Sequence, residues 1–297
     1  VELCTNNACE ELTVCVDGCA IDSPQLLFVF DASAGMLEDA APSSQESRWD
    51  ALVSSIQTAF SGYEGVIDAG LKVFPTLDTP GNCFVKINDD DGKPHLELPF
   101  GSSASAIASL LAFGDPDGAT PMTDSLGVAL NAFKTLAPNG DRFIIFLTTG
   151  KETCGGNPLA LVQALALQGV STAVIGYGTG VDPELLDDMA VAGGLAKGEV
   201  HPGDRRFYEV NTGADLDAAL YDLLARMVSE RCNGLDDDCD GLVDEDVAPL
   251  SCNFSCQGQL QQGFRYCSAG TWSTCQQDQA LEICNGKDDN CSGQADD

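Results

Sequence analysis

The stretch LLFVFDASAGM, residues 26–36, decides the fold. Five apolar residues lead into Asp31, Ser33 and a run of small residues, as in a buried strand that ends in a tight turn. An aspartate and a serine delivered to such a turn are typical of a cation or phosphate site at the carboxyl end of a parallel strand. Gly35 stands where a third side-chain oxygen would complete the turn. The stretch therefore predicts the shell of a metal site and leaves open whether a metal binds there.

Strand-like and amphipathic helical stretches alternate through the middle of the chain. The apolar strand candidates are residues 26–30, 70–74, 143–148, 171–175 and 207–210. The helix candidates are residues 48–60, 104–111, 123–136, 159–167, 183–189 and 214–227. This order predicts an α/β fold with an open, mostly parallel, doubly wound sheet covered by helices on both faces. We predict that residues 142–149 form the central strand and residues 26–31 the strand beside it, because both runs are apolar throughout.

The charge balance limits the classes of partner. The chain has 46 acidic and 14 basic residues, a net charge of −32. Such a charge repels nucleic acid and anionic membranes and favours cationic partners. The hydrophobic share of 44% predicts a folded core rather than a disordered acidic chain.

The fourteen cysteines are even in number and clustered, and only two histidines, His95 and His201, accompany them. This usage favours a disulfide framework in an oxidising compartment, with a cytosolic zinc protein as the alternative. The sequence shows neither a signal peptide nor a run of 18 apolar residues, so we expect no membrane span in this chain. We expect an exported protein, extracellular or at the cell surface, whose export signal has been removed or whose numbering starts at a mature or trimmed end.

Changes in composition divide the chain into five segments. We predict a disulfide-rich cap at residues 1–22, the α/β domain at 23–229, an acidic repeat at 230–246, a disulfide-rich spacer at 247–280 and a second acidic repeat at 281–297. The repeats read ERCNGLDDDCDGLVDED and EICNGKDDNCSGQADD, and their Cys, Asn, Gly and Asp positions align in one register.

The α/β segment resembles the von Willebrand factor type A domain. The matching stretches are FVFDASAGM, SRWDALVSSI, GATPMTDSL and FIIFLTTGKETCG, and they lie in the family's order. The resemblance implies a divalent cation such as Mg²⁺ or Mn²⁺ in the crevice, held by an Asp-x-Ser-x-Ser turn, a threonine from a second loop and an aspartate after a later strand. It also implies that a ligand's carboxylate completes the metal's coordination.

Asp31, Ser33 and Thr120 match the family's metal positions, whereas Gly35 replaces the second serine and Thr149 replaces the aspartate. Mg²⁺ prefers six oxygen ligands in near-octahedral geometry, and these changes leave one carboxylate. Either a weakened metal site remains, or the turn persists because Asp31 and Ser33 hydrogen-bond neighbouring loop amides. We expect the second case.

Cys83 and Cys154 stand apart from the cysteine clusters, in loops that the fold would bring near the crevice. We predict a disulfide between them, the alternative being two buried free thiols.

The acidic repeats carry a stronger metal signal. Calcium loops of the EF-hand type place oxygen ligands at alternate positions around a glycine turn. The predicted ligands are Asp236, Asp238, Asp240, the Leu242 carbonyl and Asp244 in the first repeat, and Asp288, Asn290, Ser292, the Gln294 carbonyl and Asp296 in the second. Glu245 and Asp297 are candidates to replace the missing bidentate glutamate.

Within each repeat two cysteines lie seven residues apart, so intra-loop disulfides Cys232–Cys239 and Cys284–Cys291 are plausible. The repeats resemble Cys-Asn-Gly-x-Asp-Asp-x-Cys-x-Gly motifs of secreted bacterial proteins that are regarded as metal-binding. Copper is sometimes linked with those motifs, but paired cysteines without a nearby histidine favour calcium. A solvated acidic tail is the alternative.

No nucleophile and base are recognisable, and both histidines lie in polar surroundings typical of surface residues, so we expect no enzyme. Two hypotheses remain. The first is an extracellular binding or adhesion protein whose type A domain docks a protein or glycan partner, with calcium-stabilised repeats. The second is a structural module of a secreted or envelope assembly with no ligand in the crevice.

Overall fold

The computed structural model describes residues 23–41, 44–77, 83–137, 140–197, 203–232, 234, 242–256 and 259–275. The chain forms two compact units, one of residues 22–227 and the other including residues 228–297.

The first unit is built on a five-stranded parallel sheet with the strand order β2-β1-β3-β4-β5. Its strands are β1 (Gln25–Asp31), β2 (Asp68–Phe74), β3 (Arg142–Thr148), β4 (Val170–Tyr177) and β5 (Tyr208–Val210). β3 is the central strand and β1 lies beside it, as the apolar sequences predicted. Every residue of β1 is buried, which explains its unbroken apolar run.

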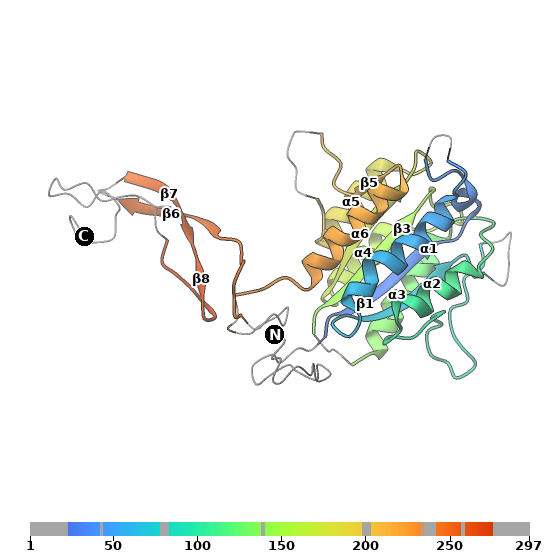
Figure 1. The fold of residues 1–297 in the computed structure, drawn as a ribbon, viewed down its shortest axis with the longest axis horizontal. Coiled ribbons are helices and arrows are strands. Elements are labelled where there is room, and N and C mark those ends of the chain that lie inside the picture. The colour runs from blue at the N-terminus through green and yellow to red at the C-terminus, as the bar shows by residue number, and fades with distance from the viewer. Residues whose placement is uncertain are drawn as a thin grey trace, which may run out of the picture. The chain divides into compact units, whose positions relative to one another are not determined.

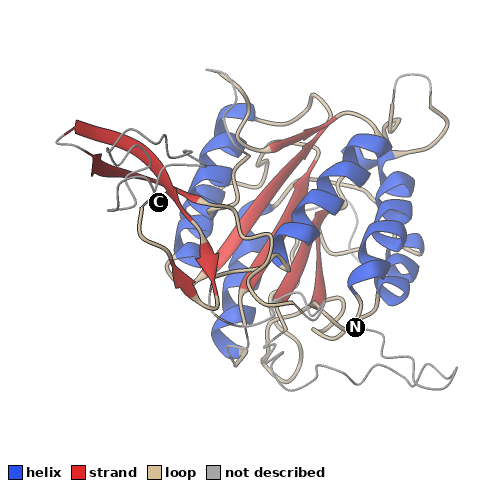
Figure 2. Ribbon diagram, turned by 60° about the vertical axis from the view of Figure 1, so that its left-hand side comes forward, coloured by secondary structure: helices blue, strands red, loops and turns tan. Residues whose placement is uncertain are grey.

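Helices cover both faces of this sheet (Figures 1 and 2). They are α1 (Arg48–Ala59), α2 (Ala104–Ala112), α3 (Met122–Thr135), α4 (Pro158–Ala166), α5 (Pro183–Gly193) and α6 (Gly213–Met227), with 3₁₀ turns η1 (Ala34–Leu37) and η2 (Phe60–Tyr63). α1 packs against α2 and α6, and α4 packs against α3 and α5. The predicted helix starts have physical causes: Ser47 forms a capping box with Asp50 on α1, and α4 and α5 begin with proline after a capping Asn157 or Asp182.

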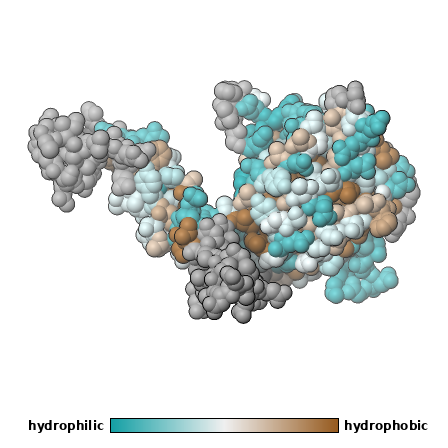
Figure 3. All heavy atoms as spheres, viewed as in Figure 1, coloured by the Kyte–Doolittle hydropathy of each residue, from teal (hydrophilic) through white to brown (hydrophobic). Residues whose placement is uncertain are grey.

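The edge strand β2 is protected by the insertion that follows it, residues 83–100. Leu98 pairs with Leu71 in an antiparallel bridge, and the Glu97 carboxylate accepts a hydrogen bond of 2.7 Å from the Val73 amide. The insertion therefore satisfies edge groups that would otherwise offer a pairing site to another strand. Its outer loop carries a run of charged residues, seen as the hydrophilic projection at the lower right of Figure 3.

The strands in the described part of the second unit form two hairpins. β6 (Leu250–Cys256) pairs with β7 (Gln259–Arg265), and β8 (Cys267–Ser268) pairs with β9 (Thr271–Trp272). Disulfides join Cys232 to Cys267 and Cys252 to Cys275. None of the helices found in the described residues is both long and apolar enough to span a membrane.

The predicted Cys232–Cys239 disulfide is wrong, because Cys232 pairs with Cys267 of β8. The buried Asp244 side chain accepts hydrogen bonds from the Gly234 and Gly270 amides, which draws the first repeat and the β8–β9 turn together. Cys239, Cys284 and Cys291 lie outside the described residues, so the Cys284–Cys291 pairing stays a prediction.

Candidate functional site: the crevice at the carboxyl ends of the strands

Asp31, the last residue of β1, is the centre of the crevice and is fully buried. Its Oδ1 accepts a hydrogen bond from the Ser33 amide at 2.8 Å. Its Oδ2 accepts from the Thr149 amide at 2.9 Å and from the hydroxyls of Thr148 at 2.8 Å and Thr149 at 3.2 Å. Both carboxylate oxygens are therefore engaged by protein donors.

Gly35 and Thr149, the two residues that depart from the family's metal motif, lie against each other. A Cβ atom added to Gly35 would lie 2.6 Å from Oγ1 of Thr149, closer than real Cβ contacts come. The Thr149 hydroxyl also lies 3.5 Å from the Ser33 hydroxyl. The threonine thus fills space that a serine at position 35 would need, so the two replacements act as a pair.

The four predicted crevice residues Asp31, Ser33, Thr120 and Thr149 are all buried at this end of the sheet. Thr120 enters from the loop before α3, and its amide donates to Oγ1 of Thr153 at 2.8 Å. A Cβ atom on Gly150 would lie 3.0 Å from Oγ1 of Thr120, so the two loops are in close contact.

Further bonds tie the loop after β3 to its neighbours. The Glu152 carboxylate accepts from the amide and the hydroxyl of Thr123 at 2.8 and 2.9 Å, next to the start of α3. Cys154 forms a disulfide with Cys83 of the insertion after β2, which confirms the predicted pairing. The loops at this end are therefore cross-linked to one another, covalently and by hydrogen bonds.

Arg48, at the start of α1, contributes a buried cation beside the metal-type turn. Its guanidinium donates to the Gly35 carbonyl at 3.1 Å, lies 2.8 Å from the Glu38 carboxylate and stacks 5.5 Å from the centre of the Tyr177 ring. No role of Arg48 was predicted from the sequence, where its position as a basic residue just after Ser47 was the available signal.

These residues fit a divalent cation poorly. The crevice offers one carboxylate, already bonded to four donors, and Gly35 contributes no side-chain oxygen. Burial raises the pKa of Asp31, and the hydrogen bonds from Thr149, Ser33 and Thr148 oppose that shift. The residues present therefore form a hydrogen-bonded turn and do not supply the ligand set that the family's metal site uses.

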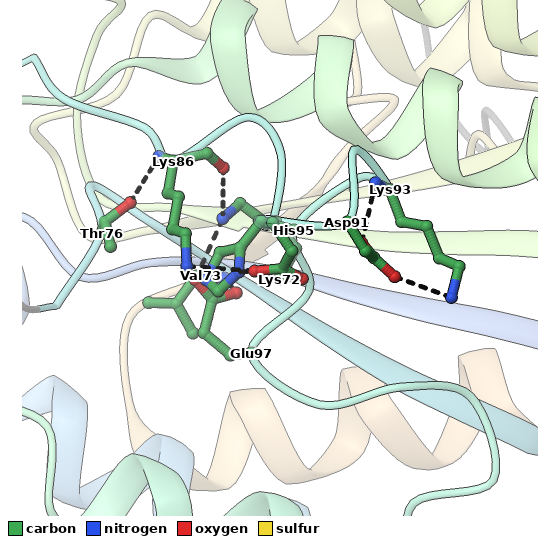
Figure 4. Close-up of polar contacts among 9 residues, drawn as sticks. Lys72, Val73, Thr76, Lys86, Asp91, Lys93, His95 and Glu97 are labelled. Carbon is green, nitrogen blue, oxygen red and sulfur yellow. Dashed lines mark hydrogen bonds and ion pairs between the residues drawn. The ribbon is translucent and has the colours of Figure 1, made fainter.

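A second cluster of charges, which was not predicted from the sequence, lies where the insertion meets β2 (Figure 4). Lys72 is fully buried, and its ammonium lies 3.0 Å from Oε1 of Glu97. Oε1 of Glu97 is also 3.5 Å from Nε2 of His95, whose Nδ1 lies 2.7 Å from the Asp89 carboxylate. His95 was expected at the surface, but its side chain is only 17% exposed, so that interpretation is wrong. His201 lies outside the described residues.

We expect His95 to make the stability of the protein depend on pH. The hydrogen bond with Glu97, reinforced by Asp89, raises the pKa of His95 above its ordinary value, although partial burial and the Lys72 charge act against the shift. The stabilisation is therefore complete below the unfolded-state pKa, near 6.5, and disappears as the pH rises through the higher pKa of the folded protein.

Denaturant unfolding of the wild type and His95→Gln between pH 5 and 9 measures this effect. The wild-type advantage should be about 1 kcal/mol or less at the acid end, as for partly exposed ion pairs, and should shrink toward the alkaline end. An advantage that grows with pH would contradict the assignment.

In the second unit, only Leu242, Asp244 and Glu245 of the predicted calcium ligands are described. Asp244 is buried with φ of 57°, and its two carboxylate oxygens accept from the Gly234 and Gly270 amides at 2.9 and 2.5 Å. These bonds orient the carboxylate. The predicted ligands outside the described residues are Asp236, Asp238, Asp240, Asp288, Asn290, Ser292, Gln294 and Asp296.

Cys232, Asp244 and Cys267 also lie close enough together to suggest a metal cluster. The two sulfur atoms are bonded to each other, however, so neither is a thiolate ligand. Only the Asp244 carboxylate of this group can contribute to a cation site.

Two known proteins of Bacillus subtilis (strain 168) are similar to parts of the chain. The uncharacterized protein YwmC is 37% identical over 73 residues, which cover 25% of this chain and 32% of YwmC. The uncharacterized protein YwmD is 34% identical over 82 residues, which cover 27% of this chain and 37% of YwmD. The chain thus spans about a third of the length of these relatives.

Solved structures with a similar fold include BatB from Bacteroides thetaiotaomicron and the pilus adhesin SpaC from Lactobacillus rhamnosus GG. BatB has 17% identity and a TM-score of 0.49, with 69% of this chain and 98% of BatB covered. SpaC has 14% identity and a TM-score of 0.49, with 71% of this chain and 31% of SpaC covered.

Two family patterns match the sequence itself. Residues 228–245 and 277–297 match the family described as "Putative metal-binding motif". Residues 26–222 match the von Willebrand factor type A domain. The matched residues include the turn after β1, the loop that carries Thr120 and the residues at the end of β3, which together form the crevice. Because that match covers more than half of the 297 residues, the chain belongs to the von Willebrand factor type A domain family.

Proposed function

We propose that the protein is an extracellular binding module whose type A domain docks a protein or glycan partner without a metal ion in the crevice. Its C-terminal repeats bind calcium and stabilise the second unit. The observation that supports this most is the pairing of Gly35 with Thr149, which turns the metal-type turn into a closed, hydrogen-bonded one. The cross-linked loops around it form a stable platform at the edge where parallel sheets bind ligands.

The experiment is a binding screen of the purified chain against immobilised extracellular proteins and glycans, in buffer with calcium but no magnesium or manganese. We expect a partner whose affinity changes less than about threefold on adding Mg²⁺ or on Asp31→Asn exchange, since the carboxylate serves the turn and not a metal. A tenfold gain with Mg²⁺ that Asp31→Asn abolishes would instead show a working metal site.

A second candidate is a structural module with no ligand at this edge. It is favoured by the filled interior of the crevice, where Asp31, Ser33, Thr120 and Thr149 are at most 5% exposed. A screen in which the type A domain retains no partner, while the chain still assembles with copies of itself or with an envelope fraction, would support this candidate.

Calcium should stabilise the repeats by about 1.4 kcal/mol each at ten times the dissociation constant, through mass action. Extracellular calcium modules bind at about 10⁻⁴–10⁻³ M, which suits the carboxylates of Asp236, Asp238, Asp240 and Asp288. The second repeat should bind more weakly, because Asn290 and Ser292 replace aspartates of the first.

Calorimetric titration of calcium into the protein, after a chelator has removed bound metal, measures both sites. The variants Asp238→Asn and Asp288→Asn distinguish the first repeat from the second. Asp188→Asn, an exposed carboxylate on α5, is the matched control that should leave the titration unchanged. The absence of calcium-dependent heat would contradict calcium binding by the repeats, and heat lost only on changing Asp31 would place the metal site in the first unit instead.

A further inference from the structure

A pocket of about 390 Å³ lies at the carboxyl end of β2, next to the crevice. It opens between residues that follow β2, the inner part of the insertion and the end of α2, and its lining includes Thr76, Leu77, His95, Glu97 and Phe113. Since Phe74 of β2 pairs with Asp31 of β1, the pocket begins one strand away from the turn that the family uses for ligands.

Packing within the protein does not explain the exposure of Phe113. It is the C-cap of α2 and its side chain is 92% exposed, the highest value among the exposed large apolar residues that the structure describes. Leu77 and Leu110 lie beside it in the pocket lining. An exposed aromatic ring next to apolar neighbours is the usual composition of an anchoring site for another molecule.

The same wall of the pocket is electronegative. Asp115 lines the pocket, is exposed, and makes no hydrogen bond or ion pair with any residue that the structure describes. α2 ends here with no basic residue in its last turn, so no positively charged side chain of the helix offsets the negative end of its dipole. A cation bound at this place is stabilised electrostatically by the Asp115 carboxylate, by the carbonyl end of α2 and by the aromatic ring of Phe113.

The groups that shape the pocket are held in place by buried contacts. The Trp49 indole donates to the Leu111 carbonyl at 2.9 Å, and a Cβ atom on Gly114 would lie 2.8 Å from the Trp49 ring. The loop that carries Phe113 and Asp115 therefore passes directly over Trp49. Elsewhere in the lining, Glu97 is fixed by Lys72 and the Val73 amide (Figure 4). His95 is fixed by Glu97 and Asp89.

We propose that this pocket binds a lysine or arginine side chain of a protein partner, with the cationic group at Asp115 and the aliphatic stem on Leu77, Leu110 and Phe113. This inference rests on the proposed binding function and names the chemistry of the docked residue. A chain with a net charge of −32 attracts basic protein surfaces over long range and repels nucleic acid and anionic lipid. The apolar lining selects a cation that carries a hydrocarbon stem over a bare metal ion.

The test is a titration of the isotope-labelled full chain, followed by amide chemical shifts, with N-acetyl-lysine and N-acetyl-arginine methylamides as probes. Their neutral counterparts, the norleucine and citrulline derivatives, carry similar stems without the charge. We expect saturable shifts at Phe113, Gly114 and Asp115 with the cationic probes, and an affinity at least about threefold lower for the neutral ones, as for a partly exposed charge pair.

Asp115→Asn should reduce the affinity for the cationic probes about threefold to fivefold, and Phe113→Ala should reduce it for cationic and neutral probes alike. Asp188→Asn on α5 is the matched charge control. The end of α4 is an internal control in the wild type, because Leu167 is an 85% exposed C-cap with no basic residue in the last turn and no Asp or Glu within five residues along the chain.

Equal affinity for norleucine and lysine derivatives, an Asp115→Asn variant that binds as the wild type does, or equal shifts at the end of α4 would each overturn the proposal. Because the probes act without the natural partner, failure here with a successful partner screen rejects the pocket and leaves the binding function standing.

Discussion

Replacing Glu97 with alanine should lower the free energy of unfolding by about 3–5 kcal/mol, because it strands a buried ammonium without its partner. Lys72 is fully buried in β2, and Glu97 supplies its nearest carboxylate at 3.0 Å. The same carboxylate also accepts the Val73 amide of the edge strand. Burial lowers the pKa of Lys72, an effect that Glu97 opposes, so removing Glu97 should favour loss of the ammonium proton.

Urea unfolding of Glu97→Ala and of the double variant Lys72→Met/Glu97→Leu measures this effect. The double variant should recover most of the loss, since an apolar pair of similar size leaves no buried charge. Asp91→Ala breaks the exposed Lys93–Asp91 pair of the same insertion and should cost less than about 1 kcal/mol. Equal costs for Glu97→Ala and Asp91→Ala would contradict the burial of Lys72.

Asp31→Ala should lower the free energy of unfolding by roughly 2–4 kcal/mol, because it leaves buried donors without an acceptor. The Ser33 and Thr149 amides and the Thr148 hydroxyl all donate to this carboxylate. Asp31→Asn should cost less, since its amide keeps the shape and one acceptor oxygen. Thermal or urea unfolding compares the two variants with Asp188→Asn. A fully stable Asp31→Ala variant would show that the turn does not depend on these bonds.

Much of the fold could be predicted from local patterns. The apolar runs at residues 26–30 and 143–148 predicted two adjacent inner strands, because strands covered on both faces have no polar side to show. Proline and capping residues set the starts of α4 and α5. Asp31 and Ser33 were found because they end or follow an apolar strand, whereas Thr120 and Thr149 were assigned from the resemblance to the type A domain family.

The parts that could not be predicted depend on contacts between distant residues. Lys72 and Glu97 are separated by 25 positions and an irregular insertion with no periodicity, so nothing in the sequence placed His95 between two carboxylates. Cys232 could be paired with any later cysteine, and only the β8–β9 hairpin brings Cys267 to it. The contact between the Thr149 hydroxyl and Gly35 likewise could not be predicted, because it depends on how the two loops lie relative to each other in space.

Manganese titration of the isotope-labelled full chain tests the metal-independent crevice most directly, because bound Mn²⁺ broadens the amide signals near it. The Gly35→Ser/Thr149→Asp variant is the positive control, since it returns the serine and the carboxylate that the family uses. We expect the Ser33 and Thr149 amides of the wild type to keep their intensity while the Leu242 and Asp244 amides of the repeat broaden. Selective broadening of the wild-type Ser33 and Thr149 signals, as in the control variant, would contradict the account.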